Sequence, residues 1–129
     1  MTATITITNP ILSGMNPDPS WIWDDEFQRI VLVTSTFELV PGLPIYVSED
    51  MTCWKHVSNV IDADLARRLL IPFVDDSGGV YAPTLRRIHG KYVIACTIAR
   101  LDDRRAMEGG CTESELMRFH AAEGNFILE

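Results

Sequence analysis

An aspartate held between two prolines is the residue whose setting first suggests chemistry in this sequence. It is Asp18, in the segment Ser13 to Ser20 (SGMNPDPS). Proline fixes its own φ and pushes the residue before it out of the α region, so we predict that Asn16 and Asp18 are extended. Asp18 is then a rigidly presented acid, able to accept or donate a proton. The simpler interpretation is a surface turn, because Asn-Pro and Asp-Pro are ordinary turn formers.

Other residues with reactive side chains have plainer interpretations. We expect His56 and His89 to be strand-end or turn residues and His120 to lie on a tail helix. Four acidic residues are interpreted as solvated turn carboxylates: Asp24, Asp25, Asp75 and Asp76. The 3 cysteines form no CxxC pair and so signal neither a disulfide framework nor a zinc site. We expect reduced, mostly buried thiols, no metal and no cofactor.

Composition narrows the class of partner. The chain has 129 residues, 47% of them hydrophobic and 22% charged, which is typical of one globular domain. Its formal net charge of -7 disfavours nucleic acid and anionic membranes, because both would be repelled over most of the surface. A neutral ligand such as a sugar fits this balance. With no signal-peptide pattern and no membrane-spanning stretch in the sequence, we expect a soluble, cytoplasmic protein.

Short strands must position the candidate residues. Alternating or β-branched patterns predict strands at residues 4–8, 29–36, 43–47, 53–57, 84–88 and 92–98. Turns separate them at short intervals, including Pro41-Gly42 and His89-Gly90, which is typical of antiparallel all-β structure. Similar strands recur about 40 to 60 residues apart, as in the blades of a β-propeller.

Two segments favour helix instead. Asp62 can cap a short helix that carries an apolar stripe and ends before Pro72. Near the C-terminus, Thr112 and Glu115 form a possible capping box, and local propensity predicts a helix over residues 113–123. We therefore divide the chain into residues 1–99, with β texture, and a divergent tail, 100–129, that is helical or irregular. The closing residues, 125–128, could instead begin the strand of a next blade.

Three segments in order resemble a known family. They are NPILSGMNPDPS, TSTFELVPGLPIYVSEDMTCW and SGGVYAPTLRRIHGKYVIACT, which together span Asn9 to about Thr97. This series is similar to the start of a family 43 glycoside hydrolase of the β-xylosidase and α-L-arabinofuranosidase type. Each motif is modest alone, but three in this order are fairly specific. The fold implied by the resemblance is a partial five-bladed β-propeller, about the first two blades.

The resemblance also implies roles for individual residues. The aspartate of the NPDPS segment is the family's catalytic base, which falls on Asp18. The aromatic residues of the TSTF and GG-x-aromatic-AP segments line the terminal sugar subsite, and these fall on Phe37 and Tyr81. The family commonly has Trp where this chain has Tyr81. The implied ligand is a pentose-containing oligosaccharide of the xylan type. Without the family, Phe37 and Tyr81 would be interpreted as core or rim packing, and we assign Trp54 to blade packing.

The second carboxyl group of such an enzyme is not among the matched residues. Inverting glycosidases pair a general base with a general acid about 6.5–9.5 Å away. In the family the acid is a glutamate from a later blade, and neither Glu113 nor Glu123 lies in a matching segment. A five-bladed propeller needs over about 200 residues. We therefore expect an N-terminal fragment that lacks glycosidase activity alone and self-associates through open sheet edges.

Two alternative functions remain open from the sequence. The first is a non-catalytic carbohydrate-binding or interaction module, which would keep Phe37 and Tyr81 as sugar platforms without an acid–base pair. The second is an unrelated small β protein in which NPDPS is only a turn. The sequence does not choose between a xyloside and an arabinofuranoside as substrate.

Overall fold

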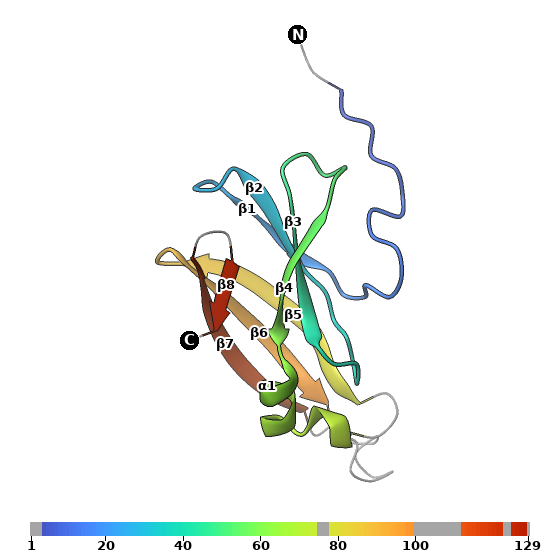
Figure 1. The fold of residues 1–129 in the computed structure, drawn as a ribbon, viewed down its shortest axis with the longest axis vertical. Coiled ribbons are helices and arrows are strands. Elements are labelled where there is room, and N and C mark those ends of the chain that lie inside the picture. The colour runs from blue at the N-terminus through green and yellow to red at the C-terminus, as the bar shows by residue number, and fades with distance from the viewer. Residues whose placement is uncertain (1–3, 75–77, 100–111, 123–124, 129) are drawn as a thin grey trace.

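The described residues fold into two antiparallel sheets of four strands each (Figure 1). The computed structural model describes residues 4–74, 78–99, 112–122 and 125–128. The first sheet has the order β1-β2-β3-β4 and the second the order β5-β6-β7-β8, so every strand pairs with its neighbour in sequence. The strands are β1 (Ser20–Asp24), β2 (Arg29–Val33), β3 (Gly42–Ser48), β4 (Lys55–Ile61), β5 (Gly79–Ile88), β6 (Lys91–Ala99), β7 (Thr112–Ala122) and β8 (Asn125–Leu128).

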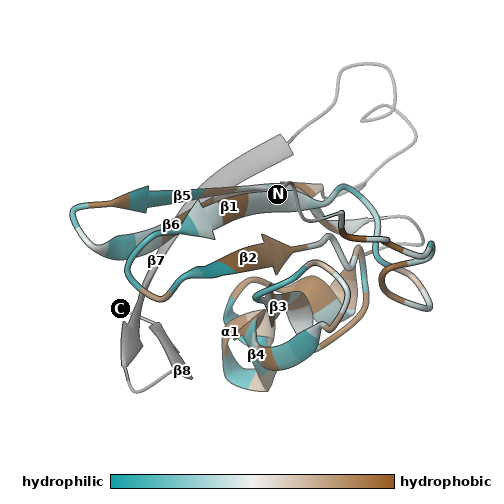
Figure 2. Ribbon diagram, turned by 90° about the horizontal axis from the view of Figure 1, so that it is seen from above, coloured by the Kyte–Doolittle hydropathy of each residue, from teal (hydrophilic) through white to brown (hydrophobic). Residues whose placement is uncertain are grey.

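The first sheet is built around β2, whose β-branched sequence predicts a buried strand. Four of its five residues are buried, and it pairs with β1 on one side and β3 on the other. Figure 2 shows β2 as a strongly hydrophobic strand between β1 and β3. The prediction for this region is confirmed, although β2 ends at Val33 and residues 34–36 continue as buried chain without strand pairing.

The predicted short helix is also confirmed. Helix α1 (Ala63–Arg68) begins after Asp62, whose side chain accepts a hydrogen bond of 2.8 Å from the backbone N–H of Leu65. This is the N-cap contact that the sequence predicts. Of the predicted apolar stripe, Leu65, Ala66 and Leu69 are buried against the core, whereas Leu70, beyond the end of the helix, is exposed. A single 3-10 turn, η1 (Ile71–Phe73), follows and contains Pro72.

The second sheet begins with the hairpin of β5 and β6. His89 and Gly90 form its turn, with φ values of 51° and 77°, as hairpin turns with right-handed twist require. The register of β5 against β6 shifts between Tyr81 and Thr84, which marks a β-bulge. Bulges bend a strand and redirect its side chains. This one lies beside Tyr81, a candidate site residue.

The predicted tail helix is wrong. Residues 112–122 form strand β7, which pairs with β6 from Tyr92↔Phe119 to Ala99↔Thr112, and His120 lies on this strand. The closing residues form β8, the fourth strand of the same sheet, rather than the start of a next blade. The edge of β6 has a row of backbone N–H and C=O groups that need hydrogen-bond partners. Pairing with this edge outweighs the weak helix propensity of residues 112–122.

The alternating segment at residues 4–8 is not a strand either. It has no regular secondary structure, and Ile5 and Ile7 are exposed. In Figure 1 this N-terminal segment runs apart from both sheets. Thr and Ile favour an extended chain, but a strand also needs a partner edge, and none of the described residues pairs with this segment.

The two sheets share one core and one buried polar network. Side chains from both sheets and α1 fill the core, among them Val33, Ile45, Leu85 and the fully buried Tyr92. Strand β1 lies against β5. In the described part of the chain, no helix is long and apolar enough to cross a membrane.

Asp24 lies in this network, so the prediction that its carboxylate is solvated is wrong, although its Oδ1 does accept turn hydrogen bonds from the backbone N–H groups of Glu26 at 3.1 Å and Phe27 at 3.4 Å. The residue is 0% exposed. Its Oδ1 receives a hydrogen bond of 2.6 Å from Arg87 of β5, and its Oδ2 receives one from the Tyr92 hydroxyl of β6. A buried carboxylate is retained only when it is paired in this way. Asp24 therefore ties the end of β1 to the second sheet.

Candidate active site

Asp18 lies at a bend just before β1, with its carboxylate bound by a serine. The hydroxyl of Ser35 donates to Asp18 Oδ2 at 2.8 Å, and the backbone N–H of Ser35 donates to Pro17 O at 2.9 Å. The prediction that Asp18 is extended is wrong, because its φ is 50°. These two contacts from Ser35 fix the bend and outweigh the local preference of a residue before proline.

Ser35 also reaches the second sheet. It is 0% exposed, and its Oγ accepts a hydrogen bond of 2.8 Å from the backbone N–H of Ala82, on β5. Ser35 is not among the site residues predicted from the sequence. Three hydroxyl residues in a row, 34–36, follow a buried strand, and buried hydroxyls need partners. That requirement is the signal that could have found it.

Phe37 and Tyr81, the two candidate sugar-facing residues, stack on each other. Their ring centroids lie 4.4 Å apart with an interplanar angle of 26°, and both residues are half-buried. The backbone holds them together, because Phe37 and Val80 exchange two hydrogen bonds, of 3.0 and 2.9 Å. Stacked rings at this distance stabilise each other beyond their burial.

Gly79 makes this close approach possible. Its φ is 99°, a conformation that favours glycine, and a Cβ at this position would lie 2.0 Å from Phe37 O. Any other residue would therefore collide with the backbone that carries Phe37. The second glycine of the GG pair in the third motif thus has a local structural reason.

Three residues around the candidate site share an uncommon backbone conformation. Asp18, Phe37 and Ala82 have φ values of 50°, 54° and 44°, in the left-handed region that non-glycine residues seldom occupy. Each such residue costs on the order of 1–3 kcal/mol, and they cluster at functional sites. Hydrogen bonds from Ser35 and Val80 hold this strained group.

The site carries negative charge next to the aromatic pair. Burial raises the pKa of the Tyr81 hydroxyl above its usual 10.0, and the nearby carboxylates of Glu38 and Asp18 raise the pKa further. Both carboxylates penalise a negative phenolate. Asp18 itself is exposed, and in the described chain only its Oδ2 accepts a hydrogen bond. Its Oδ1 is thus able to bind water, as a general base must.

The histidines do not join this group. His56 lies on β4, with its ring 5.4 Å from that of Tyr46, and His89 lies in the β5–β6 turn, so both interpretations are confirmed. Trp54 is half-buried and donates from Nε1 to Met51 O at 3.1 Å.

Several other candidates lie apart from the group or outside the described residues. Asp25 is exposed, as expected for a turn carboxylate, whereas Asp75, Asp76 and Cys111 are outside the described residues. Cys96 is buried and Cys53 is exposed. In the described part of the chain, no three His, Cys, Asp or Glu residues gather as a metal site requires.

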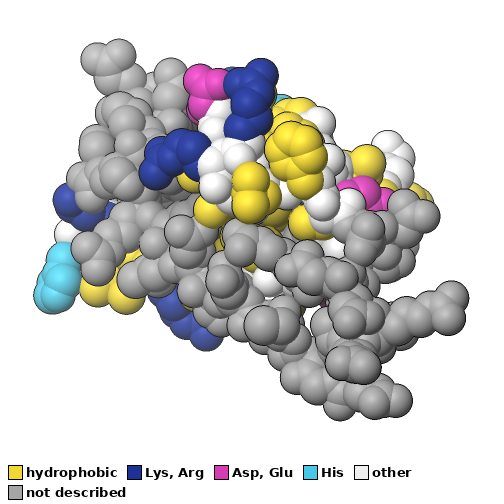
Figure 3. All heavy atoms as spheres, turned by 90° about the horizontal axis from the view of Figure 1, so that it is seen from below, with side chains coloured by type: hydrophobic (Ala, Val, Ile, Leu, Met, Phe, Trp, Pro, Cys, Tyr) yellow, Lys and Arg dark blue, Asp and Glu magenta, His cyan; other side chains and the backbone are white. Residues whose placement is uncertain are grey.

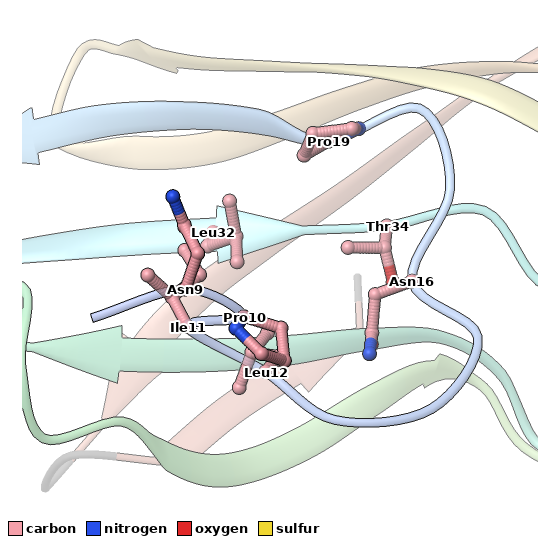
Figure 4. Close-up of a pocket in the computed structure, with 8 residues that line it drawn as sticks. All are labelled: Asn9, Pro10, Ile11, Leu12, Asn16, Pro19, Leu32 and Thr34. Atoms are coloured by element: carbon pink, nitrogen blue, oxygen red, sulfur yellow. The ribbon is translucent and has the colours of Figure 1, made fainter.

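A separate cavity of about 220 Å³ lies between the N-terminal segment and β2 (Figure 4). It is formed by the N-terminal segment, β2 and the chain that follows β2, and it is mostly apolar. Its lining does not include Asp18, Phe37 or Tyr81, so it is distinct from the surface on which they meet. The lining residues are Asn9, Pro10, Ile11, Leu12, Asn16, Pro19, Leu32 and Thr34.

Sequence and structure comparisons agree on the family. The model of glycosyl hydrolases family 43 matches residues 7–127. The chain is 43% identical over 94 residues to the non-reducing end alpha-L-arabinofuranosidase BoGH43B of Bacteroides ovatus, covering 71% of this chain and 17% of that protein. It is 40% identical over 91 residues to the xylan 1,3-beta-xylosidase of a Vibrio species, covering 69% of this chain and 16% of the relative.

A solved structure extends the match over the fold. The GH43 BlXynB protein from Bacillus licheniformis superposes with a TM-score of 0.72 and 28% identity, over 93% of this chain and 23% of that one. The chain spans less than a fifth of the length of the arabinofuranosidase and of the xylosidase that it matches in sequence. With the three motifs, the two all-β sheets and the family match over residues 7–127, the chain belongs to glycosyl hydrolases family 43.

Proposed function

We propose that this chain supplies the general base and the sugar-facing wall of a glycosidase that releases xylose or arabinose from xylan-type oligosaccharides. The observation that carries the proposal is that Asp18 and the Tyr81–Ala82 segment share one hydrogen-bonded residue, Ser35. An acidic group and an aromatic face that are held together suit a neutral sugar. The names of the relatives, an arabinofuranosidase and a xylosidase, support the substrate class.

In this proposal Asp18 Oδ1 deprotonates a water, which attacks the anomeric carbon from the face opposite the leaving group. The C–O bond to the leaving sugar breaks, and a second carboxylic acid protonates the leaving oxygen, which gives inversion. That acid would come from residues beyond those matched in this chain. The stacked rings of Phe37 and Tyr81 would hold the apolar C–H face of the pentose beside Asp18.

We also propose that the two sheets are two blades of a five-bladed propeller, whose other blades complete the site. Isolated, the chain exposes large apolar side chains, including Trp21, Trp23 and Phe73. Figure 3 shows hydrophobic side chains exposed among charged ones on the side where α1 lies. Such surface favours self-association, so sedimentation should detect oligomers of the isolated chain.

The test is a chimera. Residues of this chain replace the matching 94-residue segment of the Bacteroides ovatus arabinofuranosidase, and hydrolysis of aryl α-L-arabinofuranoside and aryl β-D-xyloside is measured. We expect activity, and a fall of about 10²–10⁴-fold on Asp18→Asn, the usual contribution of a general base. The matched control is Asp25→Asn, an exposed carboxylate on the turn after β1.

Two results would contradict the proposal. One is a folded chimera without activity, and the other is full activity in the Asp18→Asn chimera. If the isolated chain bound xylose while the folded chimera stayed inactive, the non-catalytic carbohydrate-binding module would be the better interpretation.

A further inference from the structure

We propose that Ser35 is a positioning residue that holds the base carboxylate and the aromatic wall as one unit. The proposal rests on the proposed function of Asp18 and deepens it. Its starting point is that the Ser35 hydroxyl contacts two segments far apart in sequence. Asp18 precedes β1 in the first sheet, and Ala82 lies on β5 in the second, 47 residues beyond Ser35.

The direction of both hydrogen bonds is fixed by chemistry. The Ala82 N–H can only donate, so Ser35 Oγ accepts there at 2.8 Å. The single hydroxyl hydrogen of Ser35 is then available to donate to Asp18 Oδ2, also at 2.8 Å. A serine hydroxyl has one donor and two lone pairs, so this arrangement uses it without conflict. Consecutive hydrogen bonds of this kind polarise and strengthen each other.

The backbone of Ser35 adds a third restraint. Its N–H donates to Pro17 O at 2.9 Å, so both the carboxylate and the backbone of the Asp18 bend are held by one residue. Ser35 is 0% exposed and so is held in place by its surroundings. The two positions that it holds, Asp18 and Ala82, both have left-handed φ values and would relax without it.

The consequence concerns the distance between the base and Tyr81. Without the serine bridge, the Asp18 carboxylate and the Ala82 N–H each lose their Ser35 partner, while the backbone nearby stays tied by Leu85 N–H to Ser20 Oγ at 3.0 Å and by the Phe37–Val80 pair. The Asp18 side chain can then rotate relative to the Tyr81–Ala82 bulge. A sugar stacked on Tyr81 would then lie at a variable distance from the base. A misplacement of about 1 Å can cost about 10²-fold in rate. Ser35 thus sets orientation while making no contact with the reacting atoms.

A neighbouring threonine provides a matched control. Thr34 is 1% exposed, and its Oγ1 has no hydrogen-bond partner in the described part of the chain. Ser35→Ala and Thr34→Val each remove one buried hydroxyl from adjacent positions. Only the first breaks the bridge between Asp18 and Ala82.

The first measurement does not require hydrolysis. In the ¹⁵N-labelled 129-residue chain, the amide resonance of Ala82 is followed through an acid titration. We expect the Ala82 resonance to shift when Asp18 takes up a proton. The shift should disappear in Ser35→Ala and in Asp18→Asn, and it should remain in Thr34→Val. Glu38, the other carboxylate near Tyr81, is excluded as the source if Glu38→Gln keeps the shift. A shift of equal size in Ser35→Ala, or none in the natural chain, overturns the proposal.

The second measurement uses the active chimera. Ser35→Ala should lower kcat by up to about 10²-fold with little change in KM, whereas Thr34→Val leaves both unchanged. An equal fall in both variants would indicate general loss of packing and contradict the positioning role. If the chimera is inactive while the Ala82 shift depends on Ser35, the proposed function fails and the bridge stands. If the chimera is active and Ser35→Ala does not change its kcat, the proposed function stands and the positioning role of Ser35 fails.

Discussion

The hydroxyl of Tyr92 donates a hydrogen bond to the fully buried carboxylate of Asp24, across the contact between the two sheets. Arg87 pairs with the same carboxylate and also with Glu26. Removing Asp24 leaves Arg87 and Tyr92 without their shared partner, and breaking a buried pair costs about 3–5 kcal/mol.

We therefore expect Asp24→Asn to lower the free energy of unfolding by about 3–5 kcal/mol, and Tyr92→Phe by about 1–3 kcal/mol. Urea unfolding measures both. The control is Asp64→Asn, which breaks an ion pair with Arg67 in which both side chains are exposed. This substitution should change the free energy of unfolding by less than about 0.5 kcal/mol. Equal effects of Asp24→Asn and Asp64→Asn would show that the buried network does not join the sheets.

Gly79→Ala should disrupt the pairing of Phe37 with Val80. The new Cβ would lie 2.0 Å from Phe37 O, so the backbone must move. Gly90→Ala is the control, because Gly90 also has a positive φ but no atom within 4 Å of an added Cβ. We expect about 1–2 kcal/mol for Gly90→Ala from backbone strain alone, and a clearly larger loss for Gly79→Ala in thermal unfolding. Similar losses would mean that the close approach is unimportant.

The Tyr81 hydroxyl should titrate above 10.0, the usual tyrosine pKa. Its folded pKa is raised, so the native state keeps its proton to higher pH than the unfolded state. The stability that it contributes is complete below pH 10 and is lost as pH rises through the folded pKa. We expect Glu38→Gln to lower this pKa, and Asp18→Asn to lower it less. Absorbance titration of the tyrosines measures the pKa, and the Tyr46→Phe background removes the signal of another tyrosine. An unchanged titration in both variants would contradict the charge contacts.

If Tyr81 forms the proposed sugar-facing wall, Tyr81→Ala should weaken xylose binding by about 10-fold, because the apolar area buried between ring and sugar is lost, at a cost on the order of 1.4 kcal/mol. Tyr81→Phe keeps the ring and should bind nearly as well. The amide resonances of Val80 and Ala82 report binding in a sugar titration. Trp21→Phe, a change at an exposed residue of β1, serves as control. Binding that survives Tyr81→Ala would show that the wall does not contact the sugar.

How far the sequence predicts the fold depends on the range of the interactions involved. Helix α1 is predictable because the contact that begins it is local: the capping residue Asp62 accepts a hydrogen bond from the N–H of Leu65, only three residues away. The tail is not, because β7 forms on the edge of β6 and local propensity favours helix there. Asp24 is a turn residue by its local contacts with Glu26 and Phe27. Its burial is not predictable from the sequence, because its other partners, Arg87 and Tyr92, lie 63 and 68 residues away.

The candidate site shows the same limit. Asp18, Phe37 and Tyr81 were identified by resemblance to the family, and the fold brings them together, while their roles stay predictions. The bend at Asp18 was not predictable, because proline chemistry favours an extended residue and Ser35 imposes another conformation. Nothing local to Ser35 shows that Ala82 will be its donor.

The network around Asp24 also bears on the order in which the chain can fold during synthesis. The first sheet pairs only neighbouring strands, so its hairpins can close as they leave the ribosome. Asp24 must then wait until Arg87 and Tyr92 have been translated. At about 5–20 residues per second, this delay lasts several seconds, during which the Asp24 carboxylate has only its turn partners and the apolar face of the sheet is open. The nascent first sheet is thus the stage at which chaperones have most to protect.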